Sequence, residues 1–238
     1  MKNPFHQRRR QYYATSGEGG LDLTALGDAR IRAKLGEGVS CIVYDAEWRG
    51  RPVALKLYKA GAVERHARLL GEELAEFEYR RNLAFYDAPG LRRFVAKPLA
   101  FYTDGCVSAF VQERLTGSLY YFYYKEHGGS VPASLTGDIG RLVESAHAAG
   151  LYDIDLHAGN VMVVEEEGVP VPKLFDFNFI PFYVHPPNPA VWLGLRLRLI
   201  DLCSRDVRKL RGFHDFRRFE RKLAREPATG IQRGAAVR

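Results

Sequence analysis

The sequence has few cysteines, no long apolar run and no internal repeat. Only 3 of its 238 residues are cysteines, and positions 41, 106 and 203 do not have the spacing of metal ligands. So few cysteines, and an odd number of them, predict a reducing compartment and no disulfide framework. The most apolar stretch, residues 191–203, is interrupted by Arg196, Arg198 and Asp201, whereas a membrane helix needs ~20 apolar residues. The basic N-terminus is not followed by the apolar stretch that a secretory signal requires. We therefore expect a cytoplasmic globular protein rather than a secreted, collagenous or integral-membrane one.

What the sequence does contain is an excess of positive charge at its two ends. Its 35 Lys+Arg against 28 Asp+Glu leave a net charge of +7, distributed as +4 over residues 1–34, −5 over residues 35–195 and +8 over residues 196–238. This asymmetry indicates an anionic partner, such as nucleic acid or the inner face of an anionic membrane. The alternative is a solvated, arginine-rich helix at residues 205–225.

Hydrophobic patterns predict the element order β-β-β-α-β-β over the first ~115 residues. Residues 29–36, 40–48 and 52–58 read as strands, residues 64–86 as a helix, and residues 94–102 and 107–115 as two further strands. A helix at 134–149, with Ser134 or Thr136 as its cap, precedes two short strands and C-terminal helices. We expect a flexible basic lead-in at 1–28 and a disordered basic tail at 226–238.

Two features of the first ~115 residues suit phosphate binding. Gly36 and Gly38 lie between two strand patterns, where backbone N–H groups can approach a phosphate closely. Lys56 lies in the strand expected at residues 52–58. Its charge is costly to bury unless an anion contacts it. The glutamates at positions 72, 73, 76 and 78 of the following helix are candidate partners of Lys56. Glu76 fits the spacing best, while positions 73 and 78 remain open.

A second group of polar residues surrounds the strand at 161–164. Asp153, Asp155, His157 and Asn160 fall within eight residues between a helix and this strand, a density that a structural loop does not need. Asp176 follows the next strand. An Asn and an Asp so placed could hold divalent cations that bridge nucleotide phosphates, which leaves Asp155 to orient an attacking hydroxyl or accept its proton.

Taken in order along residues 30–180, these motifs resemble the protein-kinase-like superfamily, in its aminoglycoside-phosphotransferase, lipopolysaccharide-kinase and RIO-like branches. The resemblance implies a two-lobed, α+β protein-kinase-like fold that binds ATP. Its two lobes would be an antiparallel-sheet lobe at 29–115 and a reduced, mainly helical lobe at 116–225. It makes Lys56 the phosphate-binding lysine and Glu76 its helix partner. The other residues that it implies in nucleotide binding are Gly36, Gly38, Val43, Ala54 and Glu113 to Leu115, the last three residues forming the hinge for adenine.

The same resemblance assigns the catalytic and metal-binding residues. Asp155 matches the catalytic aspartate, Asn160 the loop asparagine and Asp176 the metal-binding aspartate, which implies Mg²⁺ or Mn²⁺ as a cofactor. His157, in Asp-Leu-His-x-Gly-Asn, is typical of small-molecule kinases. The residues 204–208, Ser-Arg-Asp-Val-Arg, weakly resemble a helix near the end of lipopolysaccharide kinases.

The sequence also departs from the family pattern. Asp153 and Ile154 replace the usual His-Arg or His-Gly before the catalytic aspartate, and Asn178 replaces the glycine of Asp-Phe-Gly. Without that arginine, activation by a phosphorylated loop is not expected. We therefore predict an ATP-dependent kinase whose acceptor is a hydroxyl of a sugar, a glycolipid or another small molecule, and the acceptor could be anionic. The alternatives are an atypical Ser/Thr protein kinase of RIO-like type and a pseudokinase that serves as a nucleotide-dependent binding module.

Overall fold

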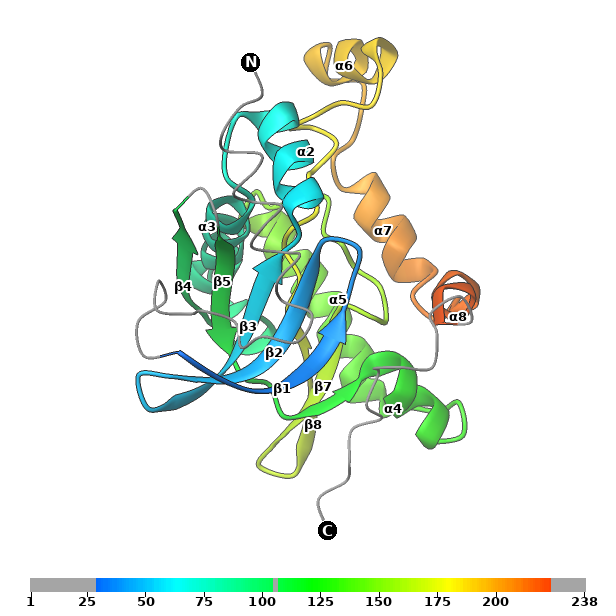
Figure 1. Ribbon diagram of the computed structural model, residues 1–238. Coiled ribbons are helices and arrows are strands. Elements are labelled where there is room, and N and C mark those ends of the chain that lie inside the picture. The colour runs from blue at the N-terminus through cyan, green and yellow to red at the C-terminus, as the bar shows by residue number, and fades with distance from the viewer. Residues whose placement is uncertain (1–28, 105–106, 224–238) are drawn as a thin grey trace. The chain divides into compact units, whose positions relative to one another are not determined.

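The computed structural model describes residues 29–104 and 107–223, without the side chains of residues 218, 222 and 223 (Figure 1). Contacts divide these residues into two compact units. Unit 1 holds residues 29–80 and 98–114, and unit 2 holds residues 81–97 and 115–223. Residues 81–97, which fall within the expected first lobe, therefore belong to unit 2. The expected lead-in and tail lie outside the described residues.

Unit 1 is built on a five-stranded antiparallel sheet with the strand order β1-β2-β3-β5-β4. The turn between β2 and β3 places Arg49 at φ 51° and Gly50 at φ 71°, the left-handed conformations that a tight hairpin turn requires. Its strands are β1 (Arg30–Glu37), β2 (Cys41–Trp48), β3 (Arg51–Tyr58), β4 (Pro98–Thr103) and β5 (Ser108–Glu113).

The single helix expected at residues 64–86 is in fact two helices. Helix α2 (Ala60–Leu70) ends at Gly71, which has φ 72° and donates its N–H to the Ala67 carbonyl. Helix α3 (Leu74–Asp87) then starts afresh. Glycine adopts this left-handed C-cap without steric penalty, and the interruption changes which residues of α3 face inward.

The alternation of side chains along β3 decides where Lys56 lies. Val53, Leu55 and Leu57 pack in one apolar cluster with residues of β5. Tyr58 packs in a second cluster, which contains residues of α2 and α3. Because successive strand side chains point to opposite faces, Lys56 shares the face of Tyr58 and is directed toward the helices.

Unit 2 combines a three-stranded antiparallel sheet, in the order β6-β7-β8, with most of the helices. Strand β6 approaches β7 so closely that a Cβ at Gly117 would lie 2.1 Å from the Val163 carbonyl oxygen, so only glycine fits there. The strands are β6 (Gly117–Leu119), β7 (Val161–Glu166) and β8 (Val169–Leu174). The helices are η2 (Arg92–Phe94), α4 (Tyr120–Glu126), α5 (Ala133–Ala148), α6 (Pro189–Arg196), α7 (Ser204–Arg211) and α8 (Arg217–Leu223).

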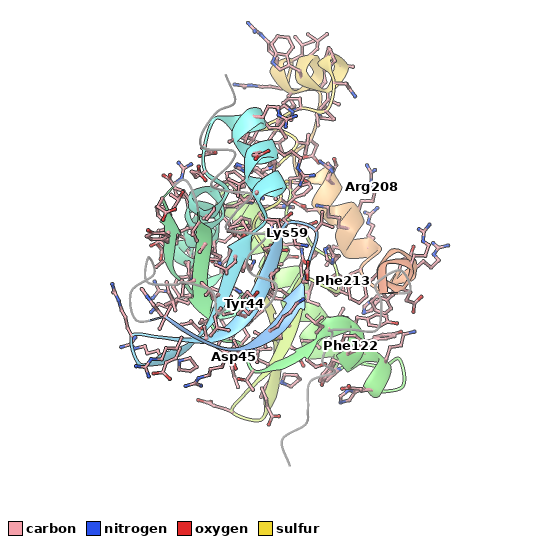
Figure 2. All side chains as sticks on the ribbon, in the orientation of Figure 1. Tyr44, Asp45, Lys59, Phe122, Arg208 and Phe213 are labelled. Carbon is pink, nitrogen blue, oxygen red and sulfur yellow. The ribbon has the colours of Figure 1, made fainter. Side chains whose placement is uncertain are left out.

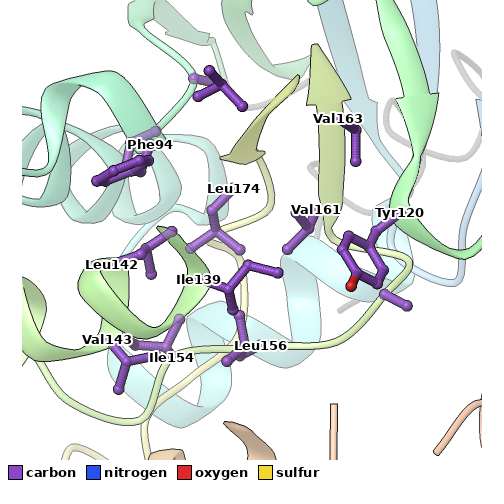
Figure 3. Packing of buried hydrophobic residues seen from close by; sticks show 14 of the residues in the cluster. Phe94, Tyr120, Ile139, Leu142, Val143, Ile154, Leu156, Val161, Val163 and Leu174 are labelled. Atoms are coloured by element: carbon purple, nitrogen blue, oxygen red, sulfur yellow. The ribbon is translucent and has the colours of Figure 1, made fainter. Parts of the chain in front are cut away.

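The core of unit 2 forms where α5 packs against this sheet. Figure 3 shows Ile139 and Leu142 of α5 beside Leu174 of β8 and near Ile154, and all four side chains are buried. Tyr120, at the start of α4, is also fully buried. Burial of these side chains fixes the two loops that lead into β7 and out of β8.

Two helix boundaries in unit 2 differ from the sequence-based expectation. Helix α5 is preceded by Pro132, with no side-chain cap, so neither Ser134 nor Thr136 is its cap. The helix expected at 205–225 is interrupted between α7 and α8. Phe213 and Phe216 lie in this interruption and are buried in the core, so their burial draws the connection inward and ends α7 at Arg211.

Candidate active site

A buried ion pair joins β3 to α3 in unit 1. Lys56 Nζ contacts Glu78 Oε1, and the two side chains are 3% and 0% exposed. Tyr58, also on β3, donates its hydroxyl hydrogen to Glu78 Oε2. Two buried charges are stabilised only when their geometry and remaining hydrogen bonds compensate for lost hydration, and here the lysine and the tyrosine occupy both carboxylate oxygens. The pair fixes the Lys56 ammonium on the helix-covered face of the sheet.

This pairing corrects the expected partner, Glu76. The Glu76 side chain is 43% exposed and lies 3.8 Å from Arg80. On α3, which begins at Leu74, the residues that face inward recur every three or four positions. This spacing places position 78 on the buried face of the helix and position 76 outside it. The buried residues of this face are Ala75, Glu78, Asn82 and Phe85.

The strand register brings the predicted phosphate-binding residues of unit 1 together. Gly36 is the cross-strand partner of Val43, and Val43 is the partner of Lys56, so the three lie in one row across β1, β2 and β3. Cross-strand partners point to the same face, and Ala54, two residues before Lys56, shares it. The register thus places Val43 and Ala54 on the face that carries the buried lysine.

The glycine turn is held by its own backbone and by Lys59. Gly38 donates its N–H to the Cys41 carbonyl at 2.8 Å, and the Lys59 ammonium donates to the Gly38 carbonyl at 2.9 Å. Lys59, labelled in Figure 2, also forms an ion pair with Glu37. Among the described atoms, none comes within 4 Å of a Cβ built on Gly36, so this side of the turn is open to a ligand.

The expected hinge, residues 113–115, falls at the end of β5. Glu113 is the last residue of β5 and pairs with Val53 of β3. The Leu115 side chain is buried in the core of unit 2. A contact of Leu115 with a nucleotide would therefore involve its backbone rather than its side chain.

In unit 2, Asp155 and Asn160 are joined directly in the loop before β7. Asn160 Nδ2 donates to Asp155 Oδ2 at 3.0 Å and to the Asp155 carbonyl at 3.1 Å. Asn160 is buried, whereas the Asp155 side chain remains 29% exposed. The asparagine therefore fixes one carboxylate oxygen while the carboxylate stays accessible to a substrate.

His157 extends this arrangement on the exposed side of the loop. The Gly159 N–H donates to His157 Nδ1 at 3.1 Å, so Nδ1 is unprotonated and a neutral ring carries its proton on Nε2. That Nε2 lies 3.8 Å from Asp155 Oδ2. The loop backbone thus selects the tautomer that points a donor toward Asp155.

Asp176 follows β8 and is drawn toward Asn160 by the backbone. Phe175 donates its N–H to the Asn160 carbonyl at 3.3 Å, and Phe177 packs on Phe85 with ring centroids 5.1 Å apart. These contacts on both sides hold Asp176 near the loop that carries Asn160. The part of the chain that is described contains no cluster of three His, Cys, Asp or Glu residues suited to a metal. The pair Asn160 and Asp176 nevertheless fits Mg²⁺, which proteins bind through one or two carboxylates together with substrate phosphates.

Asp153, the first departure from the family pattern, is the centre of a buried network. Its φ is 54° and its side chain is fully buried. Oδ2 accepts from the Phe182 N–H at 2.8 Å and from Arg205 at 3.0 Å, and Oδ1 accepts from Lys209 at 3.3 Å. Asp153 thus ties the loop that carries Asp155 both to the segment after Asp176 and to α7.

Asp206 holds the same loop from its other side. Its Oδ1 accepts from the Ile154 N–H at 2.8 Å, and its Oδ2 lies 3.1 Å from His147 Nε2. Burial raises the pKa of the Asp206 carboxyl, against the opposing effects of the His147 hydrogen bond and the Lys209 charge. His147 is therefore a structural partner of Asp206. Apart from Asp153 itself, the sequence signal for this network was the weak match at residues 204–208.

Replacing Asp153 with asparagine should destabilise unit 2. Asparagine preserves the shape and can still accept the Phe182 N–H, but it removes the carboxylate that pairs with Arg205 and leaves Lys209 only the more distant Asp206, at 3.9 Å. Because these two side chains are 39% and 24% exposed, the expected loss is about 2 kcal/mol, less than for a fully buried pair. Urea unfolding measures it, with exposed Asp201→Asn as control. Equal free energies of unfolding for Asp153→Asn and wild type would contradict the network's role.

No family model matches the sequence, and no curated protein matches it. Solved structures do match, with 1863 chains found, among them the crystal structure of Rad53 1-466 in complex with AMP-PNP. That match has a TM-score of 0.51 and 20% sequence identity; it covers 63% of this chain and 39% of that chain, so this chain spans well under half of its length. A likeness at this identity concerns the fold alone. The chain has an α+β, two-lobed protein-kinase-like fold, which confirms the fold class predicted from the sequence.

Proposed function

We propose that this protein is an ATP-dependent kinase that transfers the γ-phosphate to a hydroxyl group. The observation that carries the proposal is the Asp155–Asn160 pair, in which a buried asparagine orients a carboxylate that is still 29% exposed. A kinase needs this combination, because the aspartate must contact the acceptor hydroxyl while its position stays fixed. The buried Lys56–Glu78 pair supports the same function independently.

Each group has a distinct task in this proposal. The Lys56 ammonium, oriented by Glu78, binds phosphate oxygens, and the open side of the Gly36 turn lets backbone N–H groups approach them. Asp155 accepts a hydrogen bond from the acceptor hydroxyl. It takes the hydroxyl proton as the new P–O bond forms and the bond between the γ-phosphorus and the β,γ-bridging oxygen breaks, which releases ADP. Asn160 and Asp176 would hold Mg²⁺ or Mn²⁺, which neutralises charge on the phosphates when bound.

The acceptor that we propose is a sugar, a glycolipid or another small molecule, as in the lipopolysaccharide-kinase-like branch. His157, beside Asp155, supports it, since this residue is typical of small-molecule kinases. The Asp153 network supports a site that needs no activating phosphorylation. Its carboxylate already neutralises Arg205 and Lys209, so these cations are not reserved for a phosphorylated residue.

Transfer of labelled γ-phosphate from ATP to a whole-cell extract tests the function and the acceptor together. The extract is then separated into protein, glycolipid and small-molecule fractions. Label in the glycolipid or small-molecule fraction is the expected result. Label in protein alone would replace this acceptor with a Ser/Thr residue, and ATP binding without transfer to any fraction would indicate a pseudokinase.

Replacing Asp176 with alanine should remove the magnesium-dependent part of the stabilisation by ATP. A ligand at one hundred times its Kd stabilises the folded state by about 2.7 kcal/mol, and loss of a metal ligand weakens the nucleotide's hold on the protein. Thermal shifts measured with ATP, with and without Mg²⁺, give this difference. Exposed Asp201→Ala is the control, and an unchanged magnesium-dependent shift in Asp176→Ala would exclude the metal role.

A further inference from the structure

The segment around α6 exposes an unusual amount of apolar surface. Nine large hydrophobic side chains of the described residues are exposed, and five of them fall between residues 184 and 199. None of the residues of α6 is buried. We call these five side chains the α6 patch: Val184 (47% exposed), Trp192 (50%), Leu193 (49%), Leu197 (56%) and Leu199 (76%). So concentrated an exposed apolar surface indicates an interaction site.

An ordered backbone, rather than a frayed end, holds the patch outward. Asn188 caps α6 by accepting the Val191 N–H at 3.0 Å, and Pro189 occupies the first turn. At the other end, the Leu199 N–H donates to the Gly194 carbonyl at 2.8 Å. Between these bonds Arg198 adopts φ 58°, which is unfavourable for a residue with a Cβ. The chain thus keeps a strained turn that leaves Leu197 and Leu199 in solvent.

The charged side chains within residues 184–200 are all positive, and the nearest acid is Asp201, just beyond them. Residues 184–200 contain no aspartate or glutamate, but they include Arg196 and Arg198, both exposed. The Arg196 guanidinium lies 5.2 Å from the centre of the Trp192 ring. Arg208, labelled in Figure 2, adds an exposed charge on α7. These arginines belong to the basic C-terminal end that the proposed catalysis does not use.

We propose that the α6 patch docks on the surface of an anionic lipid bilayer. Tryptophan and leucine beside arginine, without acidic residues, are the side chains of interfacial anchors, whose apolar groups enter the headgroup boundary while their cations meet anionic lipids. Helix α6 is far too short to cross a bilayer, and no helix among the described residues has the length and apolar character to do so.

The positive charge and the apolar surface of the patch together favour a bilayer over a nucleic acid or a second copy of the chain. A nucleic acid would use the arginines but would leave five apolar side chains in water. A second copy in a two-fold contact would bring the same arginines together, and the nearest acid, Asp201, already accepts the Cys203 N–H at 2.9 Å. An anionic bilayer satisfies both features.

Fluorescence of Trp192 in the full chain tests the proposal, because Trp48 is the only other tryptophan. In a Trp48→Phe background, vesicles containing phosphatidylglycerol should shift the Trp192 emission to the blue and protect it from acrylamide, whereas phosphatidylcholine vesicles should not. Arg196→Gln and Arg198→Gln should each weaken vesicle binding about fivefold, and Leu197→Ser with Leu199→Ser should weaken it further. Arg92→Gln and Val169→Ser, exposed changes elsewhere, should have no effect.

Three results would overturn the proposal. The first is absence of binding to phosphatidylglycerol vesicles, or binding that the patch variants do not change. The second is a Trp192 already shielded from acrylamide without vesicles, which would mean that another part of the chain covers the patch. The third is a wild-type dimer that the leucine substitutions convert to a monomer, which would make the patch an interface between copies. None of these readouts depends on catalysis, so they are independent of the proposed kinase activity.

Discussion

Replacing Asp155 with asparagine is expected to lower the rate of phosphoryl transfer about 10²- to 10⁴-fold, the usual contribution of a positioned general base. Asparagine keeps the shape of the side chain but cannot accept the proton of the acceptor hydroxyl. The Asn160 contacts concern one carboxylate oxygen and the loop carbonyl, so the loop should keep its conformation. The rate is measured with labelled ATP and the acceptor fraction identified for the wild type.

Nucleotide binding separates this effect from misfolding. Asp155→Asn should bind ATP with a Kd close to that of the wild type, because phosphate binding is assigned to other residues. Asp201→Asn, an exposed change in unit 2, should retain full activity. Unchanged transfer by Asp155→Asn would remove Asp155 from the catalytic role.

The sequence allowed prediction of those features that depend on local pattern. Strands β1 to β5 follow from alternation of apolar residues and from turn glycines. Lys56 was conspicuous because a charge within an apolar strand needs a partner. Asp155 and Asn160 stood out by their density in a short loop, and the structure places their side chains in contact. Each of these signals lies within a few residues of the feature that it predicts.

Features that depend on the start of a helix or on distant residues were not predictable. The glutamate that pairs with Lys56 depends on the phase of α3, and Gly71 resets that phase by ending α2. A single continuous helix over 64–86 places its inward stripe at different residues. Likewise, the sequence revealed Asp153 as a departure, but its partners Arg205 and Lys209 follow more than fifty residues later. Only tertiary packing brings such residues together.

Replacing Glu78 with alanine should be the most destabilising change in unit 1. It leaves the Lys56 ammonium, 3% exposed, without its carboxylate, and removal of one partner of a buried pair costs about 3–5 kcal/mol. Urea unfolding followed by Trp48 emission reports on unit 1, since Trp48 lies on β2; a Trp192→Phe background removes the other signal. The expected result is a lower midpoint with an unchanged slope.

Two further variants show whether the loss of stability comes from breaking the Lys56–Glu78 ion pair. Glu76→Ala, at the position that the sequence favoured, should change the free energy of unfolding by no more than about 0.5 kcal/mol, because its side chain is 43% exposed. Adding Lys56→Met to Glu78→Ala should recover part of the stability, because the buried ammonium that lost the Glu78 carboxylate is then removed as well. If Glu76→Ala destabilises unit 1 more than Glu78→Ala does, the pairing is wrong. If the double variant is as unstable as the sum of the single ones, the two side chains are not coupled, and the orientation of Lys56 for phosphate binding must come from other contacts.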